Sequence, residues 1–240
     1  MANGQKPTVA ILGSGLNVIA ARNWSIQPFD KLIAINNAWQ VRKDWDDLIF
    51  PYDFPSNRKP IHFKPKQKVI TETEFVPVQN QYGGFVYAGA TMAFTAAYWV
   101  LGHYNPKEIA FLGCDMSYPK NGRTHFYGNG AADPLRQDIT LLSLKAKAAR
   151  LYSLALEQGC EITNLSKSTS SLIAPRRSLL TPRPKPLQID QVQKKKALTR
   201  EQKLAYYVPS GRYWEDLGRF DVAEIRSLDT LWESVVLDAL

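Results

Sequence analysis

The stretch TVAILGSGLN, residues 8–17, decides the fold. Its first half is a short run of β-branched and aliphatic residues, which is typical of a buried strand. The run stops at Gly13-Ser14-Gly15, and residues 17–23 are expected to form the first turns of a helix. A strand that passes through a small-residue turn into a helix is the unit from which α/β proteins are built.

The same alternation continues to about residue 165. Further strands are expected at four places: Lys31–Ile35 (KLIAI), residues 47–50, Glu108–Leu112 (EIAFL) and residues 161–165 (EITNL). The spacing of apolar residues predicts helices over residues 89–101 and 135–158, the second ending at Gly159. Short apolar strands that alternate with helices indicate βαβ units. We therefore predict an α/β fold with a Rossmann-like, doubly wound, mostly parallel sheet.

The composition excludes several classes of protein. Of the 240 residues, 45% are hydrophobic, which rules out general disorder. The two cysteines, Cys114 and Cys160, are too few for a disulfide framework or a four-cysteine zinc site, and Cys114 is interpreted as a small buried hydrophobe. Residues 1–6 lack the apolar run of a signal peptide, and no segment has the roughly 20 apolar residues of a membrane span. The expected compartment is the cytoplasm.

The formal net charge of +8 is concentrated in one segment. Residues 175–203 hold nine basic and two acidic residues, whereas the rest of the chain holds 21 basic and 20 acidic residues. Pro182, Pro184 and Pro186 predict that this segment is an extended linker. We expect a nucleotide-donor-binding catalytic domain over residues 1–174, the basic linker over 175–203 and a C-terminal amphipathic helical segment over 204–240.

Ligands of open parallel sheets bind beyond the carboxyl ends of the strands, at the topological switch point. This rule selects four loops: residues 13–17, 36–39, 113–125 and 164–171. In the first, Gly13, Ser14 and Gly15 offer backbone N–H groups at a helix start, which suits a phosphate. Val18 stands where a dinucleotide fingerprint has its third glycine, so an ordinary tight turn is the alternative.

Amide and hydroxyl side chains accompany these loops. Asn36 and Asn37 follow the second strand, where an amide that donates and accepts can read a base, a ribose or a sugar, or simply form a turn. Thr91 opens the helix predicted from residue 89, where it can cap the helix or face a ligand phosphate. Asn164 and Ser166 follow the last strand and are further candidates for donor binding.

Asp115 and His125 are the candidates for acid–base chemistry. Asp115 follows the Glu108–Leu112 strand, and His125 comes ten residues later among polar and aromatic loop residues. Histidine changes its charge nearest to neutral pH and is the usual general base or acid. We expect the carboxylate and the imidazole to face one crevice.

Asp44-Trp45-Asp46 matches the short DxD pattern that holds a divalent metal in many glycosyltransferases. The pattern follows Arg42-Lys43 in a polar stretch and is common by chance. We interpret it as a solvated helix end and predict no metal site.

Six motifs in this order resemble the bacterial sialyltransferase-like group, which includes the CMP-sialic-acid-dependent sialyltransferases of lipooligosaccharide synthesis. They are GSGLN at residues 13–17, AINNAW at 34–39, GAT at 89–91, LGCDMSY at 112–118, HFYG at 125–128 and ITNLSKSTSSL at 162–172. Proteins linked to motility-accessory factors and to archaeal pterin diphosphokinases show the same order. The resemblance covers about residues 7–175, and Leu16-Asn17 replaces the Pro-Ser pair that is usual in the first motif.

The resemblance implies a modified Rossmann core and a transferase that needs no metal or other cofactor. It implies that Ser14, Asn17 and Asn36 contact the nucleotide, that Thr91 stands near the donor phosphate and that His125 deprotonates the acceptor hydroxyl. The leaving phosphate would then be stabilised by hydroxyl or N–H groups, for which Tyr118 and Tyr127 are available.

The leading hypothesis is thus a metal-independent glycosyltransferase whose partners are a nucleotide-activated sugar, with a CMP-sugar favoured, and a hydroxyl-bearing acceptor. The acceptor is a glycan, or DNA held by the basic residues 175–203. Three alternatives stay open: a phage-type transferase that modifies a nucleic-acid base, a pterin-type diphosphokinase, and a non-catalytic nucleotide-binding or assembly protein. A homo-oligomer is also left open.

Overall fold

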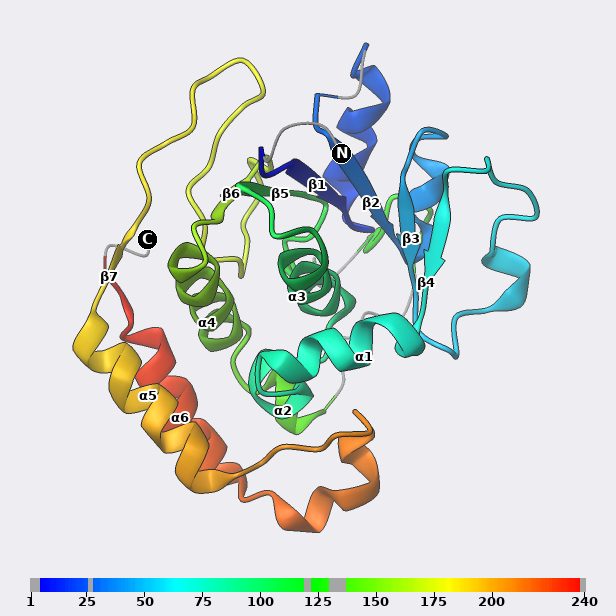
Figure 1. Ribbon diagram of the computed structural model, residues 1–240. Helices are drawn as coiled ribbons and strands as arrows, with labels where there is room; N and C mark the ends of the chain where they lie inside the picture. Colours follow the sequence, from blue (N-terminus) through cyan, green and yellow to red (C-terminus); the bar gives the residue numbers. More distant parts are fainter. Residues whose placement is uncertain (1–4, 26–27, 119–121, 130–136, 238–240) are drawn as a thin grey trace.

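The computed structural model describes residues 5–25, 28–118, 122–129 and 137–237. Its centre is a sheet of six strands: β1 (Thr8–Leu12), β2 (Lys31–Ile35), β3 (Asp47–Ile49), β4 (Lys68–Ile70), β5 (Glu108–Leu112) and β6 (Glu161–Asn164). The spatial order is β4-β3-β2-β1-β5-β6, and every neighbouring pair is parallel (Figure 1). The prediction of a Rossmann-like α/β fold is therefore confirmed.

The chain changes direction across the sheet once. From β1 to β4 each new strand is added on one side, and β5 then pairs with the other side of β1. The switch point therefore lies between β1 and β5, so the loops that leave these two strands start side by side.

Alternate residues of each strand enter two separate apolar layers, because successive side chains of a strand point to opposite faces. Val9 and Ile11 of β1 pack with α3 (Met92–Tyr104) and α4 (Leu144–Glu157). Ala10 and Leu12 pack instead with aromatic residues of the connecting segments, among them Trp45, Phe50 and Phe54. The remaining covering elements are α1 (Glu72–Gln81), α2 (Phe85–Ala88) and the 3-10 helices Leu16–Asn23, Asn36–Gln40, Ser56–Arg58 and Ile139–Leu141.

The start of α4 differs from the prediction. The helix begins at Leu144 rather than at the expected residue 135, and residues 135–136 lie outside the described part of the chain. Ser143 ends the preceding segment, because its Oγ accepts a hydrogen bond from the Ala146 N–H and so caps the helix. Asp138 caps the separate 3-10 turn before it in the same way. The helical spacing of apolar residues continues through this region, but the caps at Asp138 and Ser143 divide it into a 3-10 turn and a separate α-helix.

The predicted extended linker is also only partly correct. Residues 175–187, all of them described, run without a helix, but α5 (Gln191–Leu204) follows, capped by Asp190. A second helix, α6 (Val222–Glu233), comes after the 3-10 helix Tyr213–Arg219, and β7 (Gln188–Ile189) pairs with β8 (Val236–Leu237). Three apolar residues of the predicted amphipathic stretch are buried in α6: Ile225, Leu228 and Trp232.

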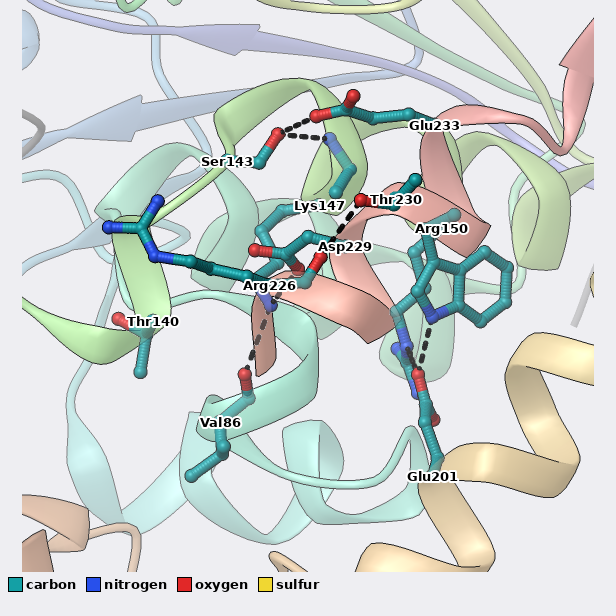
Figure 2. Close-up of polar contacts among 12 residues, drawn as sticks. Val86, Thr140, Ser143, Lys147, Arg150, Glu201, Arg226, Asp229, Thr230 and Glu233 are labelled. Carbon is teal, nitrogen blue, oxygen red and sulfur yellow. Dashed lines mark hydrogen bonds and ion pairs between the residues drawn. The ribbon is translucent and has the colours of Figure 1, made fainter. Parts of the chain in front are cut away.

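Helices α5 and α6 pack against α4 and α2 through a cluster of buried apolar residues, and buried ion pairs cross the same contact (Figure 2). Arg150 of α4 forms an ion pair with Glu201 of α5, and Lys147 of α4 forms one with Asp229 of α6. The Lys147 Nζ also donates to the backbone oxygen of Val86 in α2. These contacts join the C-terminal helices to the segment that leads into Thr91, at the start of α3.

Candidate functional site

The loops that leave β1 and β5 touch each other at the switch point. The N–H of Gly13 donates to the Leu112 oxygen and that of Gly15 to the Gly113 oxygen, both at 2.8 Å. A Cβ on Gly13 would collide with the Gly113 oxygen, and one on Gly15 would lie 2.9 Å from it. Gly113 itself has a φ of +75°. The small residues that suggested a phosphate turn therefore have a structural role, because they let two backbone segments meet.

Asp115 is the centre of a buried polar network that joins three loops. Its Oδ2 accepts hydrogen bonds from Asn17 Nδ2 at 2.6 Å and from Ser166 Oγ at 2.7 Å, and its Oδ1 accepts one from Asn164 Nδ2 at 3.2 Å. Asn17 Nδ2 also lies 2.5 Å from Ser166 Oγ. Asp115 is only 7% exposed. With three donors on it, Asp115 fixes the relative positions of the loops after β1, β5 and β6.

A turn at residues 125–128 holds His125 against the first loop. The backbones of His125 and Gly128 exchange hydrogen bonds of 2.9 and 3.1 Å, and the Phe126 N–H donates to the Ser14 oxygen at 3.1 Å. His125 is 5% exposed, and its Nδ1 lies 2.8 Å from Thr124 Oγ1.

Two tyrosine rings flank the imidazole. The His125 ring stacks on Tyr127 with centroids 5.0 Å apart, and the Tyr118 ring is 5.7 Å away. Within the described part of the chain, no hydrogen bond joins His125 to Asp115. The two residues predicted to face one crevice thus belong to adjoining groups, one around a carboxylate and one around an imidazole.

Thr91 caps α3, since its Oγ1 accepts a hydrogen bond from the Phe94 N–H at 3.3 Å. The hydroxyl also lies 3.5 Å from the sulfur of Met116, directly after Asp115 in the β5 loop. Thr91 is 2% exposed. The capping role foreseen for Thr91 is confirmed, and the contact with Met116 brings the start of α3 to the same edge of the sheet.

Two amide oxygens at this edge have no hydrogen-bond donor among the described residues. They are Asn17 Oδ1, after β1, and Asn36 Oδ1, after β2. Asn36 also has a left-handed backbone with a φ of +50°. Asn37 beside it is 3% exposed. A buried oxygen without a donor costs about 1–3 kcal/mol, so both positions are suited to a ligand that donates hydrogen bonds.

Two arginines at the same edge were missed by the sequence analysis. The Arg58 guanidinium lies 5.9 Å from the Tyr127 ring centroid, and the Arg58 oxygen accepts a hydrogen bond from Trp39 Nε1 at 2.9 Å. Arg176 Nη1 donates to the Ser166 oxygen at 2.6 Å, and its backbone makes a parallel bridge with Asn164. No local pattern marks either residue, because both reach the edge through contacts distant in sequence.

The other polar motifs have structural surroundings. Asp44 pairs with Arg42, and Asp46 accepts from Lys31 and from the Leu32 N–H, so the DxD carboxylates face cations of the chain itself. In the described part of the chain no group of three His, Cys, Asp or Glu residues could hold a metal ion. Burial raises the pKa of the Cys114 thiol, with a smaller contribution from Asp115. Among the described residues, no helix is long and apolar enough to cross a membrane.

A scan against protein-family models, a search of curated proteins and a search of solved structures found no match to this chain.

Proposed function

We propose that the protein is a glycosyltransferase that binds a nucleotide-activated sugar at the carboxyl edge of the sheet and uses His125 as general base. One observation carries the proposal. A histidine, two buried amide oxygens to which no described residue donates, and two arginines come from separate loops to the edge where open parallel sheets bind their ligands.

The donor nucleotide would lie across the switch point. Asn17 Oδ1 and Asn36 Oδ1 would accept hydrogen bonds from the base or from ribose hydroxyls. In dinucleotide-binding enzymes an aspartate accepts the hydrogen bonds of the ribose hydroxyls. Arg58 and Arg176 would neutralise the phosphate, and Tyr118 or Tyr127 would donate to it as it leaves. Guanidinium and phenol groups would thus stabilise the negative charge of the leaving phosphate, which a metal ion stabilises in other transferases.

The reaction assigned to His125 is a proton transfer. The acceptor oxygen would attack the anomeric carbon, the bond from that carbon to the phosphate oxygen would break, and the hydroxyl proton would pass to the imidazole. If Thr124 Oγ1 accepts the Nδ1 hydrogen, Nε2 carries the lone pair that takes this proton. The motif order that resembles sialyltransferase-like enzymes supports a CMP-sugar as the first donor to test.

The experiment is a donor-release assay with CMP-, UDP- and GDP-sugars, with His125→Gln as the test variant. We expect turnover to fall about 10²- to 10⁴-fold while nucleotide binding, measured by thermal shift, is kept. His62→Gln is the matched control, because His62 is exposed in the loop after β3. Unchanged turnover in His125→Gln would refute the general base, and release of AMP from Mg²⁺-ATP instead of sugar-donor turnover would assign a diphosphokinase.

A further inference from the structure

Part of the positive charge of residues 175–203 is neutralised by ion pairs within the molecule. Four of its nine cations form ion pairs with carboxylates of other elements: Arg177 with Glu108, Arg183 with Glu161, Lys194 with Glu157 and Arg200 with Glu224. Two of these cations, Arg177 and Lys194, are largely buried. The positive charge counted along the sequence is therefore not all available to an anionic partner.

Three of the five remaining cations lie on α5. Lys195, Lys196 and Lys203 are exposed, and within the described part of the chain none has a carboxylate at ion-pair distance. All three line a groove of about 570 Å³ together with Arg200, Thr199, Gln191 and Val192 of α5 and Leu231 of α6. Helix α5 lies at the outer edge of the molecule (Figure 1).

The spacing of these cations suits a linear polyanion. Lys196 and Lys203 are seven residues apart, so they lie on one side of α5, roughly 10 Å apart along its axis, and Arg200, which is paired with Glu224, lies between them. Lys195 lies beside this row. Each strand of a duplex carries one charge for about every 3.4 Å of helix axis, so the two lysines of this row can contact phosphates about three positions apart.

Other polyanionic surfaces fit less well. A helix that lies in a membrane interface needs a free apolar face, but the apolar residues Ala197, Leu198 and Leu204 of α5 already pack in the cluster with α6. Protein partners are anchored by aromatic or large apolar side chains at the centre of the interface, and the lining residues include only Val192 and Leu231. The groove favours a partner held by charge along its backbone.

We propose that this groove binds the phosphodiester backbone of a nucleic acid through Lys195, Lys196 and Lys203. The proposed binding is independent of base sequence, because it rests on contacts between lysines and phosphates, which carry no sequence information. It does not depend on the transferase activity proposed for the strand edge.

The test is fluorescence anisotropy with a labelled single strand and a labelled duplex of about 20 nucleotides or base pairs, titrated from about 50 to 200 mM salt. In Lys195→Gln/Lys196→Gln/Lys203→Gln we expect at least about tenfold weaker binding at the lowest salt and a salt slope smaller by about 2 to 3. Glutamine keeps the helix propensity of lysine, so the fold is retained.

The matched control, Lys66→Gln/Lys68→Gln/Lys185→Gln, removes the same charge from exposed positions elsewhere and is expected to bind within about twofold of the parent chain. Equal losses in both variants would overturn the proposal, as would no binding at about 50 mM salt. Binding of anionic lipid vesicles or of an acidic peptide in place of the oligonucleotides would also overturn it. Donor release should be the same in both variants, which separates this proposal from the one for His125.

Discussion

Glu201 of α5 accepts two hydrogen bonds from the guanidinium of Arg150 in α4, one from Nε at 2.7 Å and one from Nη2 at 2.8 Å. Both side chains are less than a tenth exposed. Figure 2 shows them pointing toward each other. Trp232 of α6 donates to the same carboxylate at 2.8 Å, and Tyr98 of α3 lies 3.0 Å from Arg150 Nη1. One buried ion pair thus links four helices, and the carboxylate keeps the pKa of Arg150 above its ordinary value despite burial.

Breaking this pair from one side should be costly. Glu201→Ala leaves a buried guanidinium without its counter-charge, so we expect the free energy of unfolding to fall by about 3–5 kcal/mol in urea denaturation. The double variant Arg150→Met/Glu201→Met removes both charges and should recover much of that loss. Glu215→Ala, at an exposed ion pair with Arg212, is the control and should change stability by less than about 1 kcal/mol. A loss in Glu201→Ala no larger than in the control would contradict the role of the pair.

Removal of the C-terminal helices should unfold the chain rather than yield a free sheet domain. A chain ending at residue 187 lacks α5 and α6, which exposes the apolar residues that they cover, such as Val86 and Ala146, and removes the counter-charges of Arg150 and Lys147. We expect this truncation to lose the cooperative thermal transition of the full chain, measured by circular dichroism. A truncated chain with a sharp transition near that of the full chain would show that α5 and α6 fold apart from the sheet.

Asp47 should make stability depend on pH. Burial raises its pKa above the ordinary 3.8, partly offset by the hydrogen bond from Tyr104. A raised pKa means that the folded state binds the proton more tightly. The stabilising contribution is therefore complete below about pH 3.8 and is lost as the pH rises through the folded pKa. Relative to Asp47→Asn, which has no charge to desolvate, the native chain should lose stability across this acidic range in urea titrations. If the difference in free energy of unfolding between the two chains does not change with pH, the assignment of this pH dependence to Asp47 is wrong.

Five of the six strands could be predicted from the sequence because each is a short apolar run that ends at a turn residue, as in Thr8–Leu12 before Gly13. Strand β4 was not predicted, because it has only three residues and begins at the exposed Lys68. The break before α4 could not be predicted from the same periodicity, since Leu141 and Leu144 keep helical spacing across a cap at Ser143. The prolines before residue 187 correctly indicated an extended segment, but the helix after Asp190 was hidden by its charge. At both places a capping residue, Ser143 or Asp190, marks the start of the helix more accurately than the apolar spacing or the charge does.

The part of the candidate site that lies in the loops directly after the strands could be predicted from the switch-point rule. That rule selected Asn17, Asp115 and Ser166, which the structure joins in one network. It could not select Arg176, which reaches the edge through a backbone bridge with Asn164, or Arg58, which comes from the loop between β3 and β4. Such contacts depend on tertiary packing and leave no local pattern.

Gly13 offers a way to separate a packing role from a ligand role. Gly13→Ala places a methyl group against the Gly113 oxygen and the Cys114 sulfur, so we expect a loss of about 1–3 kcal/mol in the free energy of unfolding without any ligand present. Gly218→Ala is the control, because nothing lies within 4 Å of the added carbon and the residue lies outside the positive-φ region. If Gly13→Ala is as stable as the parent chain in urea, the close approach of the two loops is not what requires glycine.

Arg176 should affect donor binding more than folding. Its side chain donates to a backbone oxygen at the rim of the site, and a charge-assisted hydrogen bond to a phosphate is worth about 1.5–3 kcal/mol. Arg176→Gln should therefore raise the dissociation constant of a nucleotide-sugar donor about 10- to 100-fold by calorimetry, with little change in the unfolding midpoint of the free protein. Arg183→Gln, which removes an exposed arginine paired with Glu161, is the matched control and should leave donor affinity unchanged. Equal affinity in the two variants would remove Arg176 from the donor site. A fall in the midpoint of Arg176→Gln that matches its loss of affinity would assign it to support of the Ser166 loop instead.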